Sequence, residues 1–178
     1  MSEVKTELTL MEKIKNKTAR LAVVGLGYVG LPLAVEFAKA GFEVTGIDDN
    51  KAKVDKVNKG ENYIIKEEQE LLKGLVDKKK IKAEYEFAVL KEVDVVFICV
   101  PTPLTKHREP DISYVKSVTD QTAKYLKRGH LIILESTTYP GTTEEVMLPI
   151  LSSNGYKVGE DFYLAFSPER VDPGNKIY

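Results

Sequence analysis

Three glycines at the spacing G-x-G-x-x-G, namely Gly25, Gly27 and Gly30, stand directly after a short apolar run at residues 21–24. Backbone without side chains can turn sharply, approach a pyrophosphate closely, and let a helix pack tightly on a strand. We therefore predict that Gly25 makes the turn, Gly27 faces phosphates and Gly30 permits the packing. The helix that follows would add N–H groups and a positive dipole end at its start. This chemistry is the binding of a dinucleotide.

A carboxylate stands where the adenosine ribose of such a ligand would lie. Asp48 ends a second apolar segment, residues 42–47, and comes 18 residues after Gly30 (48 − 30). That is near the separation at which dinucleotide-binding folds place the acid that accepts from the ribose. Asp49 follows directly, and two carboxylates would repel the 2′-phosphate of NADP, so NAD is the expected cofactor. The alternative is a glycine-rich structural turn in another α/β fold.

The remaining reactive side chains predict less. Cys99 is the single cysteine and lies in the apolar run 93–100, where a thiol usually packs as a small apolar group. His107 lies in a polar loop and is interpreted as a solvated or substrate-edge residue; His130 is interpreted as structural. Glu135 would either orient the turn after it or touch the cofactor. No His/Cys cluster has metal-ligand spacing, so no metal is predicted.

Alternating apolar segments and amphipathic stretches indicate the elements that position these residues. Strands are expected at about 21–24, 42–47, 82–88, 93–100, 130–134 and 162–166, and helices at about 29–40, 50–59, 67–80, 112–127 and 143–151. This predicts an α/β fold: a doubly wound parallel sheet (Rossmann fold) of six strands, ordered 3-2-1-4-5-6, with helices on both faces. Ligands of such sheets bind at the carboxyl ends of the strands. Residues 25–30, 101–103, 135–141 and 167–174 should therefore meet at one crevice.

Residues 1–18 are predicted to form an N-terminal helical extension, in which Thr9 and Glu12 make a capping box, and residues 19–178 an NAD-binding Rossmann domain. The 26 basic and 27 acidic residues leave a net charge of −1, so no strong field favours nucleic acid or a membrane surface. A single cysteine fits a reducing compartment. Without an apolar run of membrane-spanning length or a signal peptide, a cytoplasmic location is expected.

Four blocks of sequence together suggest a family. From about Lys17 to its end the chain resembles the UDP-glucose/GDP-mannose dehydrogenase family of NAD-dependent nucleotide-sugar 6-dehydrogenases. The blocks are G-L-G-Y-V-G-L-P-L-A at 25–34, C-V-P-T-P at 99–103, E-S-T-T-Y-P-G-T-T at 135–143 and S-P-E-R-V-D-P-G-N at 167–175. The last block and residues 108–111 resemble the branch that acts on UDP-N-acetylhexosamines. The resemblance ranks UDP-N-acetylglucosamine ahead of UDP-N-acetylmannosamine and UDP-glucose as substrate.

The resemblance implies a set of cofactor contacts beyond the three glycines. Tyr28 and Val29 would lie against the cofactor at the glycine turn. Asp48 would take the adenosine ribose hydroxyls, with Lys53 over the same ribose and phosphate region. Thr102 would touch the cofactor beyond the fourth strand.

The resemblance also implies the chemistry. Such enzymes oxidise the C6 hydroxymethyl group of the sugar to the uronic acid in two NAD-dependent steps. Thr137 would contact the cofactor and help to hold the catalytic water, and Glu169 would act in acid–base chemistry. Glu169, Arg170 and Val171 would touch the sugar nucleotide. The whole enzyme is expected to be a homodimer or a higher oligomer.

The sequence departs from the family in one respect. The family nucleophile is a cysteine in a glycine-rich segment far downstream, and no such segment occurs within the 178 residues. The chain therefore resembles the first third to half of the enzyme, without the sugar-nucleotide domain, and is expected to bind NAD without turnover. Two alternatives remain open: a stand-alone NAD-binding module, and the cofactor half of another two-domain dehydrogenase, such as a 3-hydroxyacid type.

Overall fold

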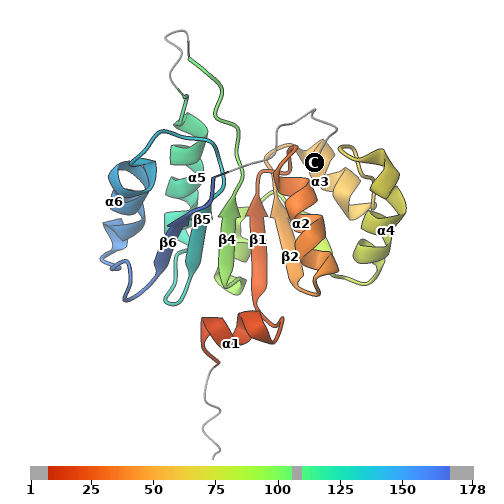
Figure 1. Cartoon of the computed structure of the whole chain (residues 1–178), viewed down its shortest axis with the longest axis horizontal. Coiled ribbons are helices and arrows are strands. Elements are labelled where there is room, and N and C mark those ends of the chain that lie inside the picture. Colours follow the sequence, from red (N-terminus) through yellow and green to blue (C-terminus); the bar gives the residue numbers. More distant parts are fainter. Residues whose placement is uncertain (1–7, 106–109, 169–178) are drawn as a thin grey trace, which may run out of the picture.

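The computed structural model describes residues 8–105 and 110–168. Six parallel strands form one sheet in the order β3-β2-β1-β4-β5-β6, which confirms the predicted doubly wound topology. Figure 1 shows the strands side by side, with β1 and β4 at the centre of the sheet. Strands β1 to β3 are added toward one edge of the sheet and β4 to β6 toward the other, so the carboxyl ends of β1 and β4 form the switch point at which ligands of such sheets bind.

The first half of the chain builds the side of the sheet from β1 to β3. The elements in order are β1 (Arg20–Val24), α2 (Gly30–Lys39), β2 (Glu43–Ile47), α3 (Lys51–Asn58), the 3-10 turn η1 (Lys66–Glu68), α4 (Gln69–Asp77) and β3 (Ile81–Glu84). Four of the five residues in β1 and four of the five in β2 are buried, as continuous apolar strands in a two-faced sheet should be. The glycine turn connects β1 to α2.

The second half builds the other side. The elements are η2 (Phe87–Glu92), β4 (Val95–Ile98), α5 (Ser113–Lys124), β5 (Leu131–Leu134), η3 (Thr142–Met147), α6 (Leu148–Leu151), η4 (Ser152–Asn154) and β6 (Tyr163–Phe166). The helix predicted at 143–151 is in fact a π-helical segment, η3, followed by one short α-helix. The strand expected at 82–88 ends at Glu84, and a 3-10 helix replaces its second half.

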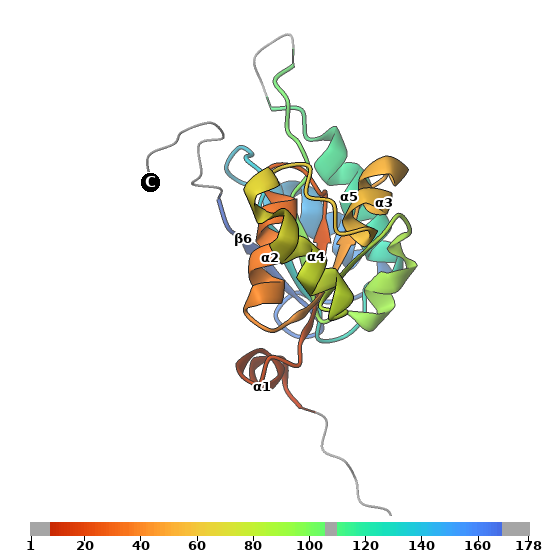
Figure 2. The ribbon, with the colours of Figure 1, turned by 90° about the vertical axis from the view of Figure 1, so that its right-hand side faces the viewer.

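Two apolar clusters hold the layers together, one on each face of the sheet. Alternate residues of β1 enter different clusters: Leu21 and Val23 pack with α2 and α4, whereas Ala22 and Val24 pack with α5 and α6. Figure 2 shows α2 and α5 on opposite sides of the sheet. This alternation follows from the two-residue period of a strand and confirms the expected helices on both faces.

Helix α3 protects the edge of the sheet. Asn58, at its last turn, donates to the Ala83 carbonyl (2.9 Å) and accepts from the Ala83 N–H (2.8 Å). The amide side chain thus satisfies the N–H and the carbonyl of Ala83 in edge strand β3, two groups that could otherwise pair with another chain. The same contact anchors α3, which begins at Lys51, shortly after Asp48.

Helix α1 (Leu10–Lys15) lies below the amino ends of the strands (Figure 1). The predicted capping box is present, with Thr9 and Glu12 exchanging side-chain and backbone hydrogen bonds. Lys13 forms an ion pair of 2.8 Å with Asp94 just before β4, and Asp94 also accepts from the Arg20 N–H at 2.9 Å. The helix is therefore attached to the end of the sheet opposite the glycine turn.

Candidate cofactor-binding site

The glycine turn has three glycines with three different surroundings. Gly25 has a φ of 93°, in the left-handed region, and a Cβ placed there would lie 2.5 Å from the Cys99 carbonyl oxygen. A Cβ at Gly30 would overlap the Gly25 carbonyl oxygen. A Cβ at Gly27 would meet nothing within 4 Å. Packing within the protein therefore requires glycine at positions 25 and 30. At position 27 the protein itself would leave room for a side chain, and this open space is available to a ligand.

The turn rests on β2 through its one large apolar residue. Leu26 is fully buried, and a Cβ added at Gly46 would lie 2.7 Å from Leu26 Cδ2. Gly46 therefore makes the room in β2 that Leu26 occupies. In addition, the Gly25 N–H donates to the Ile47 carbonyl at 2.7 Å, so the turn is attached to the second strand by both packing and hydrogen bonding.

Helix α2 begins at the end of this turn. Its N-cap residue, Val29, makes no side-chain cap hydrogen bond. In the first turn the Leu31 N–H donates to the Gly27 carbonyl at 3.1 Å and Pro32 has no N–H, so the donors that a ligand could use at this helix start come before Leu31. The dipole of the helix adds positive potential at the same place. Backbone N–H groups at such a helix start can donate to the oxygens of a phosphate. Tyr28 is 75% exposed beside it, and Val29 is half-buried against the core.

Asp48 is buried and lies at the end of β2, directly beside the turn. Its Oδ2 accepts from the Leu26 N–H (2.8 Å) and from Lys53 Nζ (3.0 Å), and its Oδ1 accepts from the Asn50 N–H (3.0 Å). The carboxylate therefore holds the glycine turn in place and also brings the predicted cofactor residue Lys53 next to it. A carboxylate has about four acceptor positions, so about one remains for a ribose hydroxyl.

The loops after β4 and β5 are joined at the same edge of the sheet. Thr102 donates its hydroxyl to the Thr137 carbonyl at 2.6 Å, and Ser136 donates to the Val100 carbonyl at 2.7 Å. Thr102 and Thr137, predicted from separate blocks, are thus brought together. Thr137 is exposed at this edge. Glu169, Arg170 and Val171 lie outside the described residues, as does His107.

The thiol of Cys99 and the imidazole of His130 are both buried in the protein. Cys99 is buried behind the glycine turn, where a Cβ on Gly30 would lie 3.2 Å from the Cys99 Cβ. His130 is fully buried; its Nδ1 accepts from the Lys127 N–H (3.3 Å), so Nε2–H donates to the carbonyls of Val93 (3.0 Å) and Leu90 (3.1 Å). Burial, together with the charge of Lys127, lowers the pKa of His130 to about 4. Both side chains are therefore interpreted as structural, as the sequence predicted.

Two residues near the turn were not predicted. Tyr63 donates its hydroxyl to the Leu26 carbonyl at 2.7 Å, and Ser136 joins the two loops described above. The sequence around Tyr63 carries no periodic pattern that places it, and a contact across 37 positions cannot be read from local spacing. Ser136 stands within the block 135–143, but its partner Val100 becomes evident only when β4 and β5 are aligned.

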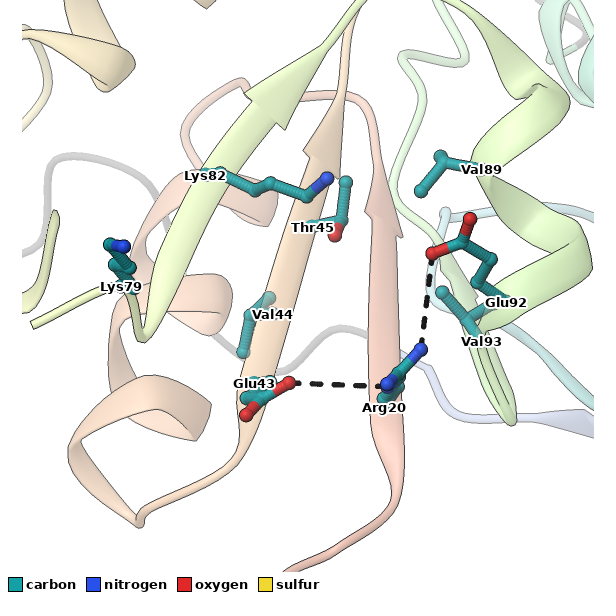
Figure 3. A pocket seen from close by; sticks show the side chains of 9 residues that line it. All are labelled: Arg20, Glu43, Val44, Thr45, Lys79, Lys82, Val89, Glu92 and Val93. Carbon is teal, nitrogen blue, oxygen red and sulfur yellow. Dashed lines mark ion pairs between the residues drawn. The ribbon is translucent and has the colours of Figure 1, made fainter.

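A separate hollow of about 250 Å³ lies at the opposite end of the sheet, near the amino ends of β1, β2 and β3 (Figure 3). Arg20 lies between Glu43 (3.9 Å) and Glu92 (3.8 Å) at its rim. These side chains are mostly exposed, where ion pairs contribute little. The hollow has no part in the glycine-turn site. Within the described ranges there is no group of three or more potential metal ligands and no helix long and apolar enough to cross a membrane.

Comparison with known proteins agrees with this geometry. UDP-N-acetyl-D-glucosamine 6-dehydrogenase of Pseudomonas aeruginosa is 38% identical over 161 residues, which are 90% of this chain and 37% of the relative. The structure of a UDP-D-ManNAc dehydrogenase from Pyrococcus horikoshii is 43% identical, with a TM-score of 0.81, over 87% of this chain and 37% of that one. A ternary complex of GDP-mannose dehydrogenase from Pseudomonas aeruginosa is 30% identical, with a TM-score of 0.82, over 86% and 37%.

The chain thus spans somewhat more than a third of the length of these relatives. Residues 19–178 match the profile of the UDP-glucose/GDP-mannose dehydrogenase family, NAD binding domain. The match includes the glycine turn, Asp48 and both joined loops. The chain belongs to the UDP-glucose/GDP-mannose dehydrogenase family, of which it contains the NAD-binding domain.

Proposed function

We propose that this chain binds NAD as the cofactor domain of a nucleotide-sugar 6-dehydrogenase whose substrate is a UDP-N-acetylhexosamine. The observation that carries the proposal is the buried Asp48, which holds the Leu26 N–H at 2.8 Å beside the open face of Gly27. The substrate class is supported by the relatives named for UDP-N-acetylglucosamine and UDP-N-acetylmannosamine. We rank UDP-N-acetylglucosamine first.

The residues present fit NAD. A side chain at Gly27 would fill space that no protein atom occupies within 4 Å, as expected where a pyrophosphate must approach the backbone. The backbone N–H groups of the glycine turn before Leu31 would donate to phosphate oxygens at the positive end of the α2 dipole, and Asp48 retains acceptor capacity for a ribose hydroxyl. Asp48 and Asp49 disfavour the 2′-phosphate of NADP. Gly25, Gly27, Tyr28, Val29, Gly30, Asp48, Lys53, Thr102 and Thr137 are the proposed cofactor-binding residues.

Oxidation of a primary alcohol to a carboxylic acid removes two hydrides, and bound NAD supplies the acceptor for each. The chain's own residues would bind and orient the reactants. Thr137, exposed at the carboxyl end of β5, would help to hold the attacking water, and Glu169 would provide acid–base chemistry. Glu169, Arg170 and Val171 would contact the sugar nucleotide. The covalent trap for the intermediate aldehyde would be a thiolate from outside these 178 residues.

The proposal extends to the whole protein. We infer that it acts in the cytoplasm as a homodimer or higher oligomer and provides uronic acid precursors for polysaccharide synthesis. The relatives share the cofactor domain and extend well beyond it. A sugar-nucleotide domain would complete the substrate pocket.

The test separates binding from turnover. We expect calorimetry to show that the purified chain binds NAD, and absorbance at the NADH band to show no steady turnover with UDP-N-acetylglucosamine, UDP-N-acetylmannosamine or UDP-glucose. Loss of reactant positioning forfeits a rate advantage that can reach about 7–11 kcal/mol. Absence of NAD binding would refute the proposal. Steady turnover that disappears in Cys99→Ala would show instead that the buried thiol is the nucleophile.

A further inference from the structure

Both backbone polar groups of Leu26 in the glycine turn, its N–H and its carbonyl, form hydrogen bonds with side chains of the protein. Asp48 accepts from the Leu26 N–H at 2.8 Å. Tyr63 donates its hydroxyl to the Leu26 carbonyl oxygen at 2.7 Å. The two bonds come from different segments, one at the end of β2 and the other between α3 and α4. Two consecutive peptide units of the turn are thereby fixed.

The bond from Tyr63 determines the direction of the next N–H group. In a trans peptide the carbonyl and the N–H of the following residue point in opposite directions, and no described peptide bond is cis. A hydroxyl that fixes the Leu26 carbonyl therefore turns the Gly27 N–H to the opposite side. Glycine restricts its own backbone least, so this orientation depends on a bond supplied from elsewhere.

The segment that presents Tyr63 is itself well braced. Asn62 is buried, and its Oδ1 accepts from the N–H groups of Ile64 (3.0 Å) and Ile65 (2.8 Å). Gln69, at the start of α4, accepts from the Asn62 N–H (2.9 Å) and donates to the Gly60 carbonyl (2.5 Å). These bonds connect the loop to the following helix on both sides of Tyr63. The phenol is thus carried on a stiff support rather than on a mobile loop.

The surroundings keep the phenol as a donor. Its ring is half-buried against the core. Burial, and after it the negative charge of Asp48, raises the pKa of Tyr63 above its ordinary value. The hydroxyl is therefore protonated in the neutral pH range and able to donate to the Leu26 carbonyl.

We propose that Tyr63 is a positioning residue for the pyrophosphate of the cofactor, acting through the Leu26 carbonyl to aim the Gly27 N–H. The inference rests on the proposed function, since it requires that the glycine turn binds NAD. It assigns a role in cofactor binding to a residue outside the glycine motif, 33 positions after Gly30 (63 − 30). Tyr63 itself would not touch the reacting atoms.

The test is Tyr63→Phe in the 178-residue chain, because this change removes only the hydroxyl. Calorimetry should show NAD binding about 3- to 10-fold weaker, the factor that corresponds to one lost hydrogen bond. Adenosine, which has no pyrophosphate, should bind the variant and the parent equally, as measured by NMR titration. The matched control is Tyr125→Phe, a half-buried tyrosine at the opposite end of the sheet, which should leave NAD affinity unchanged.

A direct readout is the ¹⁵N–¹H resonance of Gly27 in a glycine-labelled chain. In Tyr63→Phe it should shift or broaden before any ligand is added, whereas in Tyr125→Phe it should stay in place. Equal NAD affinity of parent and Tyr63→Phe would overturn the inference. So would an equal loss of adenosine binding, because that would indicate general loosening of the site. A parent chain that fails to bind NAD would instead refute the proposed function.

Discussion

Replacing Asp48 with alanine removes a carboxylate that serves the protein as well as the proposed cofactor. Three protein donors lie within 3.0 Å of it, the N–H groups of Leu26 and Asn50 and the ammonium of Lys53. The variant should therefore lose both affinity and stability. The two losses have different origins, so they can be measured separately.

The affinity loss comes from the ribose. A hydrogen bond to a charged group contributes about 1.5–3 kcal/mol, so NAD should bind the variant about 10- to 150-fold more weakly. The stability loss comes from Leu26, whose buried N–H would be left without an acceptor. That should lower the free energy of unfolding by about 1–3 kcal/mol.

Calorimetry at 15 °C gives the affinities for NAD and NADP, and urea unfolding gives the stability. The matched control is Asp49→Ala, which removes the same charge from the adjacent, exposed position and should leave NAD affinity and stability nearly unchanged. Asp48→Ala should also narrow the preference for NAD over NADP, because it frees the Lys53 ammonium that now pairs with Asp48 at 3.0 Å. Equal or tighter binding of NADP by the parent chain would refute the reasoning.

Two further predictions follow from glycine geometry and from a buried imidazole. Gly27→Ala should keep the stability of the parent and strongly reduce NAD affinity, as followed by NADH fluorescence. Gly30→Ala should instead destabilise the fold, because its Cβ would overlap the Gly25 carbonyl. Undiminished binding by Gly27→Ala would show that the pyrophosphate is held elsewhere. The pKa of His130 is lowered in the folded chain from 6.5 to about 4. Between these pH values the unfolded chain binds a proton at His130 that the folded chain does not bind, so the free energy of unfolding should fall by about 3 kcal/mol as the pH drops from 6.5 to 4. The stability of His130→Gln, measured by urea unfolding at several pH values, should not show this fall. A pH dependence identical to that of the parent would contradict the prediction.

The sequence predicts the parts of this molecule that depend on local spacing. The apolar run at 21–24, the three glycines and the acid at 48 lie within one strand–helix–strand unit. Their relative positions in the fold therefore follow from their spacing in the sequence. The strand order followed because right-handed crossovers leave few ways to arrange alternating strands and helices. The capping box at Thr9 and Glu12 was predicted for the same reason, since both partners lie within one turn.

The rest depends on contacts that local spacing does not encode. The support of the Leu26 carbonyl by Tyr63 and the bond from Ser136 to Val100 join segments that only the folded sheet brings together. The π-helical segment Thr142–Met147 was expected to be an ordinary helix, because its amphipathic pattern does not reveal how wide the turn is. The roles of Thr137 and Glu169 came from family resemblance, and chemistry at those positions still stands as a prediction.

The room that Gly46 leaves for Leu26 has a consequence for changing the cofactor preference of this domain. Gly46 is not among the proposed cofactor-binding residues and belongs to no motif, so a library of variants built around Asp48 and Lys53 would not include it. Yet a methyl group there would lie 2.7 Å from Leu26 Cδ2, and Leu26 carries both peptide groups that shape the turn. Attempts to change the cofactor preference should treat residues 26 and 46 as a packed pair, and should vary both together or neither.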